Sequence, residues 1–295
     1  MSILITGAGG QVGTELLRAF RERGRTVTAL TRQELDITDR NAVAATVRRI
    51  VPALIVNAAA YTSVDKAEDE PEVAFRINAE GAGILAEAGH AAGAGVVQFS
   101  TDYVFDGAGS APYAEDAPTN PLNVYGASKL AGEERVRSAA ARHIVVRTPW
   151  VFAAHGKNFV RSIIGAMVRG RPLDVVDDQR GCPTPAAELA DAIADFTPRV
   201  LDAAFRGWGT YHVCGFPPTT WFEFAQEIRR ALPEPSPFPV PAIRAVSTAD
   251  RPSRALRPPF SVLNTSAAER VLGLRPFDWR VALRDVVAAL LASRS

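Results

Sequence analysis

Short apolar runs alternate with longer stretches of helical periodicity through the first half of the 295-residue sequence. The short runs carry apolar residues on both faces, which is typical of strands in a parallel sheet covered by helices on both sides. The longer stretches repeat apolar residues at intervals of three and four, as an amphipathic helix does. Strands are predicted at residues 3–6, 26–30, 54–57, 95–100 and 143–147, and helices at residues 12–23, 39–50, 72–91 and 124–140. This alternation predicts an α/β protein with a Rossmann-type, doubly wound parallel sheet.

The pattern becomes less regular after residue 150. Helices are predicted at residues 159–169, 186–196, 266–272 and 278–292, and strands at residues 173–176 and 210–214. Residues 232–259 are rich in proline but interleave apolar residues, so we expect a surface crossing rather than a disordered linker. We expect residues 1–150 to form one domain, to which residues 173–215 return. Residues 151–172 and 216–295 would form a smaller C-terminal lobe.

Three glycines at a spacing of three, Gly7, Gly10 and Gly13, follow the first predicted strand and open the first predicted helix. Glycines at such a turn let the backbone approach a pyrophosphate closely, and the helix N-terminus offers it unsatisfied N–H groups. This spacing alone is a weak signal, and a glycine-rich turn without a ligand is the alternative. Its place between a strand and a helix favours a nucleotide cofactor and makes residues 1–150 the dinucleotide-binding domain.

The end of the second predicted strand, Leu30-Thr31-Arg32, bears on the choice of cofactor. An acidic residue there would bind the ribose 2′-OH of NAD, and none is present. Arg32 could pair with the 2′-phosphate of NADPH instead; an exposed arginine without a ligand is the alternative. We therefore expect NADPH, with NADH as the other candidate. Asp36 and Ile37 would lie beside the adenine, and the small alanines at 58–60 would leave room for the cofactor.

The candidate chemistry lies on the predicted helix at 124–140. Tyr125 and Lys129 are four residues apart and therefore share one helix face. A free phenol has a pKa of roughly 10, and we expect the nearby ammonium to lower it. The chain has only three lysines, so Lys129 stands out, although a solvated surface lysine is the alternative. With the glycine-rich turn and Ser100-Thr101 upstream, this pair indicates hydride transfer between a carbonyl and an alcohol.

Composition excludes several other classes. The formal net charge of +1 gives no electrostatic case for binding nucleic acid or an anionic membrane. No apolar run approaches the roughly 20 residues of a membrane helix, and the N-terminus has no signal-peptide pattern. The two cysteines and four histidines are scattered, which predicts neither a disulfide framework nor a metal site. We expect a cytoplasmic protein.

Many segments, in one order along nearly the whole chain, resemble the dTDP-4-dehydrorhamnose reductase family of extended short-chain dehydrogenase/reductases. These segments are Gly7–Gly13 with Gln11-Val12, Asn57–Thr62, Val64–Glu68, Ser100–Phe105, Pro121–Gly126, Lys129–Glu133, Arg147–Val151, Asn158-Phe159, Asp178-Gln179, Pro183-Thr184 and Arg257–Asn264. The resemblance implies reduction of the C4 ketone of dTDP-4-dehydro-L-rhamnose to dTDP-L-rhamnose, the last step of making this precursor of cell-wall polysaccharide.

The resemblance also assigns roles to single residues. It implies that Tyr125 donates the proton, that Thr101 holds the ketone oxygen, and that Lys129 lowers the tyrosine pKa and holds the nicotinamide ribose. The cofactor would contact Gly7, Gly10, Gln11, Val12, Gly13, Thr31, Arg32, Asp36, Ile37, Ala58, Ala59, Ala60, Tyr61, Thr62, Phe99, Tyr125 and Lys129. The sugar nucleotide would contact Thr101, Asp102, Trp150, Asn158 and Arg257. For Arg257 a surface charge, and for Asn158 a helix cap, is the alternative.

Other activities of the same fold stay open at this point. A 4,6-dehydratase usually carries an Asp-Glu pair after the catalytic threonine, whereas this chain has Asp102-Tyr103. The alternatives are reduction of another nucleotide 4-keto-6-deoxyhexose, and a non-catalytic regulatory subunit like that of methionine adenosyltransferase. Some relatives use Mg²⁺ at a carboxylate-lined dimer contact, but residues 290–295 hold no carboxylate, so neither the metal nor that dimer carries over. We expect a monomer or a homodimer.

Overall fold

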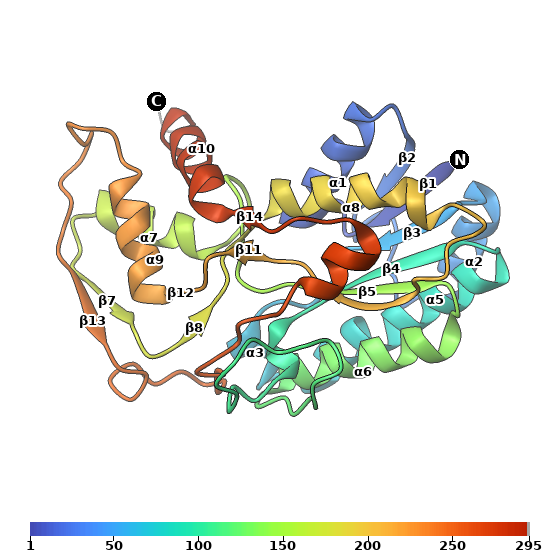
Figure 1. Ribbon diagram of the computed structural model, residues 1–295, viewed down its shortest axis with the longest axis horizontal. Coiled ribbons are helices and arrows are strands. Elements are labelled where there is room, and N and C mark those ends of the chain that lie inside the picture. The colour runs from blue at the N-terminus through green and yellow to red at the C-terminus, as the bar shows by residue number, and fades with distance from the viewer. Residues whose placement is uncertain (294–295) are drawn as a thin grey trace.

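A six-stranded parallel sheet organises the larger part of the molecule in the computed structural model, which describes residues 1–293 (Figure 1). The chain winds outward from β1 in both directions, so the strand order reverses beside β1, where such sheets bind ligands at their carboxyl ends. The strands, in the order β10-β5-β4-β3-β1-β2, are Gly209–His212, His143–Arg147, Gly95–Ser100, Leu54–Asn57, Ser2–Thr6 and Thr26–Leu30.

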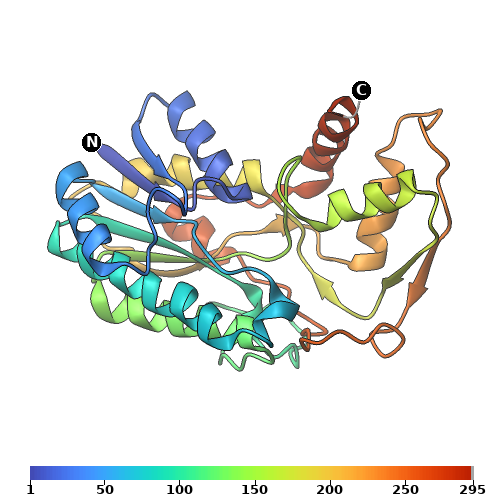
Figure 2. The ribbon, with the colours of Figure 1, turned by 180° about the vertical axis from the view of Figure 1, so that it is seen from behind.

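Helices cover both faces of this sheet because successive strand residues point to opposite sides. Ile3 and Ile5 of β1 pack in one core with residues of α1 and α8, whereas Leu4 packs on the other side with residues of α2 and α5. Figures 1 and 2 show α1 and α8 over one face and α5 and α6 over the other. These helices are α1 (Gln11–Glu22), α2 (Arg40–Ile50), α5 (Ala82–Ala91), α6 (Val124–Ala139) and α8 (Ala186–Val200). The predicted doubly wound α/β fold is confirmed.

The predicted helix at 72–91 is interrupted in the structure. It divides into α4 (Pro71–Phe75), a π-helical turn (Arg76–Gly81) and α5. Within that turn the buried Asn78 side chain accepts a hydrogen bond from the Tyr61 N–H at 2.8 Å and donates to the Tyr61 carbonyl at 3.0 Å. The π-helical turn therefore connects α4 and α5 to the loop after β3 through these two hydrogen bonds. A π-turn of this kind leaves no signal in apolar periodicity.

A second apolar core lies in the smaller lobe, at the left of Figure 1. Phe152, Phe224 and Trp279 are its largest buried side chains. The lobe is built from α7 (Phe159–Val168), α9 (Trp221–Arg230) and α10 (Trp279–Ala292), with β7 (Leu173–Val176) paired in parallel with β13 (Ile243–Val246). The stretch 232–259, expected as a surface crossing, therefore contributes a strand. Only Ile243 of this strand is buried, so its pattern was too weak to predict it.

The chain crosses several times between the lobe and the sheet. β10 joins the sheet beside β5, and α8 lies in the core against α1. β7, by contrast, pairs with β13, and we propose that the lobe includes β7. Two-residue strands pair at the crossings: β6 (Val151–Phe152) with β9 (Thr184–Pro185), β8 (Arg180–Gly181) with β12 (Thr219–Thr220), and β11 (Gly215–Phe216) with β14 (Phe277–Asp278).

Three short turns complete the described chain: α3 (Val64–Ala67), a 3-10 turn at Asp102–Val104 and a π-helical turn at Ala268–Leu272. The last turn falls within the helix predicted at 266–272. Arg294 and Ser295, the end of the expected lobe, lie outside the described residues. Among the helices of residues 1–293, none has the length and apolar character to cross a membrane.

Candidate active site

The glycine-rich loop has the shape that a dinucleotide requires. Gly7 has φ of +71°, and a Cβ there would overlap the backbone of Ala59. A Cβ at Gly13 would overlap the Gly7 carbonyl, so this glycine lets α1 pack closely on the loop. Helix α1 begins at Gln11, and no side chain caps its first N–H groups at Gly10. The open helix N-terminus therefore fits a pyrophosphate.

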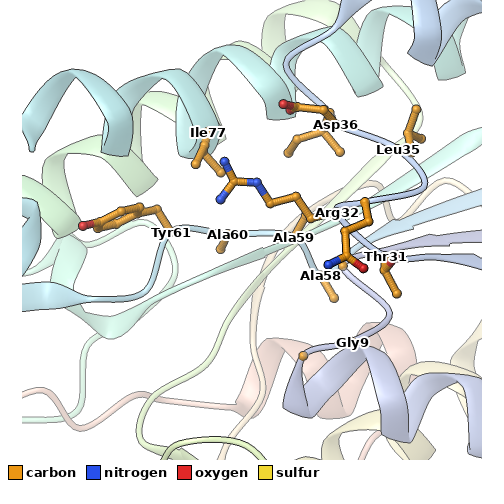
Figure 3. Close-up of a pocket in the computed structure, with 14 residues that line it drawn as sticks. Gly9, Thr31, Arg32, Leu35, Asp36, Ala58, Ala59, Ala60, Tyr61 and Ile77 are labelled. Carbon is orange, nitrogen blue, oxygen red and sulfur yellow. The ribbon is translucent and has the colours of Figure 1, made fainter.

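Two cavities meet at Gly10, Ala58 and Ala60, which line both. The first cavity, of about 460 Å³, lies at the carboxyl end of β2 and is also lined by Gly7, Gly9, Thr31, Arg32, Gln33, Leu35, Asp36, Ile37, Ala59, Tyr61 and Ile77 (Figure 3). The second, of about 530 Å³, extends toward the lobe; its lining includes Gln11, Val12, Thr62, Phe99, Thr101, Asp102, Tyr125, Lys129 and Trp150. All expected cofactor residues except Gly13 therefore line one of the two cavities.

The first cavity contains Arg32 directly after β2, and its lining carboxylate, Asp36, comes four residues later and accepts hydrogen bonds from the N–H and the hydroxyl of Thr38. Figure 3 shows Arg32 beside the loop of Ala59 and Ala60. A second carboxylate lies nearby in sequence: Glu34 accepts hydrogen bonds from the N–H and the hydroxyl of Thr31, both at 2.8 Å. These bonds lower the pKa of Glu34. The same bonds hold the Glu34 side chain against the loop after β2. The position of Glu34 was not predicted from the sequence, where only Thr31 and Arg32 were considered.

The second cavity brings Thr101, Tyr125 and Lys129 together. Thr101 follows β4, and its hydroxyl donates to Oδ1 of Asp102 at 3.1 Å. Thr101 is also near enough to Tyr125 to oppose the rise in the pKa of the phenol. Tyr125 and Lys129 are placed by α6, whose first turn is capped by Asn123 through a 2.7 Å bond from the Gly126 N–H. A threonine from a strand end and a tyrosine from a helix thus converge at one point.

The electrostatics of this group differ from our expectation. Burial raises the pKa of Tyr125 to about 12, and the charge of Asp102 adds to the shift. Burial lowers the pKa of Lys129 to about 8, while Glu133 one turn later opposes the change. The predicted lowering of the tyrosine pKa by Lys129 is therefore wrong for this structure. The ammonium donates to the Phe99 carbonyl at 2.6 Å, not to the phenol.

Polar side chains connect the carboxyl ends of three neighbouring strands beneath the site. The Thr6 hydroxyl donates to Asn57 Oδ1 at 2.7 Å, and Asn57 Nδ2 donates to Gln98 Oε1 at 2.7 Å. Gln98 Nε2 then donates at 2.7 Å to the Phe99 carbonyl, the same oxygen that accepts from Lys129. This buried network fixes the acceptor of the lysine, since each of its members has a hydrogen-bond partner.

The far wall of the second cavity is aromatic. Trp150 stacks on Trp221 with ring centroids 3.5 Å apart and an interplanar angle of 11°, and Phe159 lies 4.6 Å from Trp221. Sequence reasoning predicted Trp150 but missed Trp221 and Phe159. A signal for Trp221 was present: Thr220 and Glu223 form a capping box that starts a helix at this tryptophan.

The remaining expected substrate residues have different surroundings. Asp102 is 2% exposed and lines the second cavity, and burial raises its pKa to about 6. Arg257 also lines this cavity and forms an ion pair of 2.7 Å with Asp65.

Asn158 lines neither cavity. It caps α7 through a 3.0 Å bond from the Arg161 N–H and donates to Gln11 Oε1 at 2.7 Å. The helix-cap alternative for Asn158 is therefore the one that fits, because both ends of its amide are already engaged. Within residues 1–293, no group of three or more His, Cys, Asp or Glu side chains could hold a metal ion.

Comparison with known proteins identifies close relatives. Residues 1–292 match the family model described as the RmlD substrate binding domain. A dTDP-4-dehydrorhamnose reductase from Streptomyces griseus is 44% identical over 290 residues, which cover 97% of this chain and 93% of the relative. The crystal structure of a dTDP-4-dehydrorhamnose reductase from Clostridium acetobutylicum has a TM-score of 0.91 at 34% identity, covering 99% of this chain and 100% of that chain. The Bacillus anthracis reductase in complex with NADP has a TM-score of 0.86 at 33% identity, covering 99% of both chains.

Proposed function

The chain belongs to the dTDP-4-dehydrorhamnose reductase family, and we propose that it reduces the C4 ketone of dTDP-4-dehydro-L-rhamnose at the cavity lined by Thr101, Tyr125 and Lys129. It is an oxidoreductase that uses a nicotinamide cofactor. The observation that carries the proposal is that Thr101, Tyr125 and Lys129 line one cavity, the second, which shares Gly10, Ala58 and Ala60 with the first cavity at the glycine-rich loop. The product is dTDP-L-rhamnose.

Tyr125 is the proton donor. With its pKa raised to about 12, the phenol is protonated at neutral pH, as a free phenol also is, and it can give this proton to the oxygen of the ketone. Thr101 supplies a hydroxyl beside the phenol to orient the same oxygen. The residues that line the two cavities would hold a reduced nicotinamide cofactor, which would supply the hydride for the ketone carbon.

Lys129 provides a positive charge one helical turn from the phenol. With a pKa of about 8 it is mostly an ammonium at pH 7. An ammonium at that position stabilises the phenolate that remains after the proton has left. The Phe99 carbonyl holds the ammonium in place through its 2.6 Å hydrogen bond.

NADPH is the cofactor that we propose. Support comes from Arg32 at the first cavity, where a guanidinium suits a 2′-phosphate, and from Glu34, whose carboxylate is engaged by Thr31 and does not line the cavity. The Bacillus anthracis relative, in complex with NADP, is consistent with this choice. NADH stays the alternative that the assay must exclude.

The sugar nucleotide would occupy the second cavity. The stacked pair of Trp150 and Trp221 offers an apolar wall to a deoxysugar or a base, and Asp102 offers a carboxylate to sugar hydroxyls. Arg257 brings positive charge to the side of the lobe, where Asp65 fixes its guanidinium. The cytoplasmic location, the oligomeric state and the preference for dTDP stay predictions.

Turnover by the purified protein tests the proposal. The protein is mixed with NADPH and dTDP-4-dehydro-L-rhamnose, the loss of NADPH absorbance is followed, and NMR identifies the C4 configuration of the product. We expect oxidation of NADPH that depends on the ketosugar, with slower turnover of other nucleotide 4-keto-6-deoxyhexoses. A folded protein that binds NADPH but does not turn over, and that co-purifies with a larger enzyme, would support the regulatory-subunit alternative instead.

A further inference from the structure

Lys157 is a cation for which the proposed chemistry has no role. It lies on the loop between β6 and α7 and lines the second cavity. Its side chain is exposed, and within residues 1–293 its ammonium has no hydrogen-bond or ion-pair partner. The two other cations of this cavity are engaged, Lys129 by the Phe99 carbonyl and Arg257 by Asp65. Lys157 is therefore the unpaired positive charge of the site.

The loop that carries Lys157 is fixed against the start of α1. Gln11 Nε2 donates to the Lys157 carbonyl at 3.3 Å, and Gln11 Oε1 accepts from Asn158 at 2.7 Å. Gly156 has φ of +69°, and a Cβ there would lie 2.6 Å from Gln11 Cγ. Because Gln11 is the first residue of α1, the lysine backbone lies beside the helix N-terminus that suits a phosphate.

The second cavity has an excess of positive charge, which favours an anionic ligand. Its lining holds one carboxylate, Asp102, and three cationic side chains. Both ligands of the proposed reaction carry a diphosphate, and both must approach the point where the two cavities meet. Lys157 lines the second cavity, and its backbone is held by Gln11, the neighbour of Gly10, where the two cavities meet. An unpaired ammonium on this backbone would attract such a group.

We propose that Lys157 binds a diphosphate at the junction of the two cavities, that of the sugar nucleotide or that of the cofactor. This inference rests on the proposed function, since it takes its ligands from it. The lysine acts on binding and touches no reacting atom. Gln11 acts through the lysine by holding its loop on the glycine-rich turn.

Calorimetric titration of the full chain with three probes, dTDP, thymidine and NADPH, tests the proposal. We compare wild type with Lys157→Met, with the charge-conserving Lys157→Arg, and with Arg49→Met as a control. Arg49→Met removes one positive charge from an exposed position on α2. We expect Lys157→Met to weaken a diphosphate ligand roughly 5- to 50-fold, which is at the lower end for a charged hydrogen bond because the site is exposed. Thymidine affinity should not change.

The probes also identify which diphosphate is bound. Weaker binding of dTDP assigns the ammonium to the sugar nucleotide, and weaker binding of NADPH assigns it to the cofactor; either result supports the proposal if Lys157→Arg restores affinity and Arg49→Met has no effect. Unchanged affinity of Lys157→Met for both ligands would overturn it. A wild-type protein that binds neither dTDP nor NADPH would contradict the proposed function itself, which is a different outcome.

Discussion

Activity should fall as the pH rises from 7 to 9, because Lys129 loses its proton in that interval. Burial lowers the pKa of this lysine to about 8. Glu133 limits the shift, and it stays charged because Arg147 contacts both of its oxygens, at 2.9 and 2.8 Å. Burial lowers the pKa of His212 to about 3, so this neighbour of Arg147 adds no charge that varies between pH 7 and pH 9. Lysine carries its charge below its pKa, so the active form is the one present at lower pH.

The size of the effect follows from this pKa. With a value of about 8, roughly nine-tenths of the lysines are charged at pH 7 and roughly one-tenth at pH 9. If only the charged form supports catalysis, kcat/KM should fall about tenfold between these two pH values. Tyr125 adds nothing to this limb because its pKa is raised to about 12.

The assay measures kcat/KM for the ketosugar with saturating NADPH at closely spaced pH values. Lys129→Met is the matched variant: it should be slow at every pH and lack the alkaline limb, since the titrating group is gone. A second measurement, NADPH affinity across the same range, separates loss of cofactor from loss of catalysis. A wild-type profile that is flat up to pH 9, or a limb that persists in Lys129→Met, would refute the role of this lysine.

Two further substitutions test the proton donor and the choice of cofactor. Tyr125→Phe keeps the ring and removes the acid, so kcat should fall by at least about 10²-fold with NADPH affinity kept, and near-normal turnover would remove Tyr125 from this role. Arg32→Ala should weaken NADPH about tenfold and leave NADH unchanged, because an exposed guanidinium contributes at the lower end for a charged contact. Equal effects on both cofactors in steady-state kinetics would mean that Arg32 does not contact the 2′-phosphate.

The sheet could be predicted because four of its strands, β1, β3, β4 and β5, are buried on both faces, whereas the edge strand β2 is only partly buried. Four of the five strands predicted in the first half have the observed bounds, and the fifth differs by one residue because β1 begins at Ser2. Those runs owe their apolar character to the helices on either side, so the local sequence carries the signal. β13 is different, since two of its four residues are exposed and prolines precede it. Its pairing with β7 comes from the lobe as a whole, which the local pattern does not encode.

The site divides in a similar way. Gly7, Gly10, Tyr125 and Lys129 stood out because each belongs to a short motif whose spacing alone implies a geometry. Three other residues line the second cavity: Trp221 at the start of α9, Phe159 at the start of α7 and Lys157 on the loop before α7. They lie near the glycine-rich turn only because the chain passes repeatedly between the sheet and the lobe. No local spacing relates these residues to the glycine-rich turn. The position of Lys157 follows only from the three-dimensional structure, in which the loop between β6 and α7 packs on Gln11.

The tyrosine pKa shows where motif reasoning fails and why the chemistry still works. Spacing alone placed an ammonium beside the phenol and implied a lowered pKa, but the carbonyl of Phe99, fixed by Gln98, takes up that ammonium. Burial then dominates and raises the pKa of Tyr125 to about 12. A reductase needs its acid protonated before hydride transfer, and a phenol whose pKa is about 12 meets this condition at neutral pH, as a free phenol also does. In the proposed reaction the ammonium would be needed only afterwards, when the phenolate has formed. The same two residues would then serve reduction in an order that their spacing does not reveal.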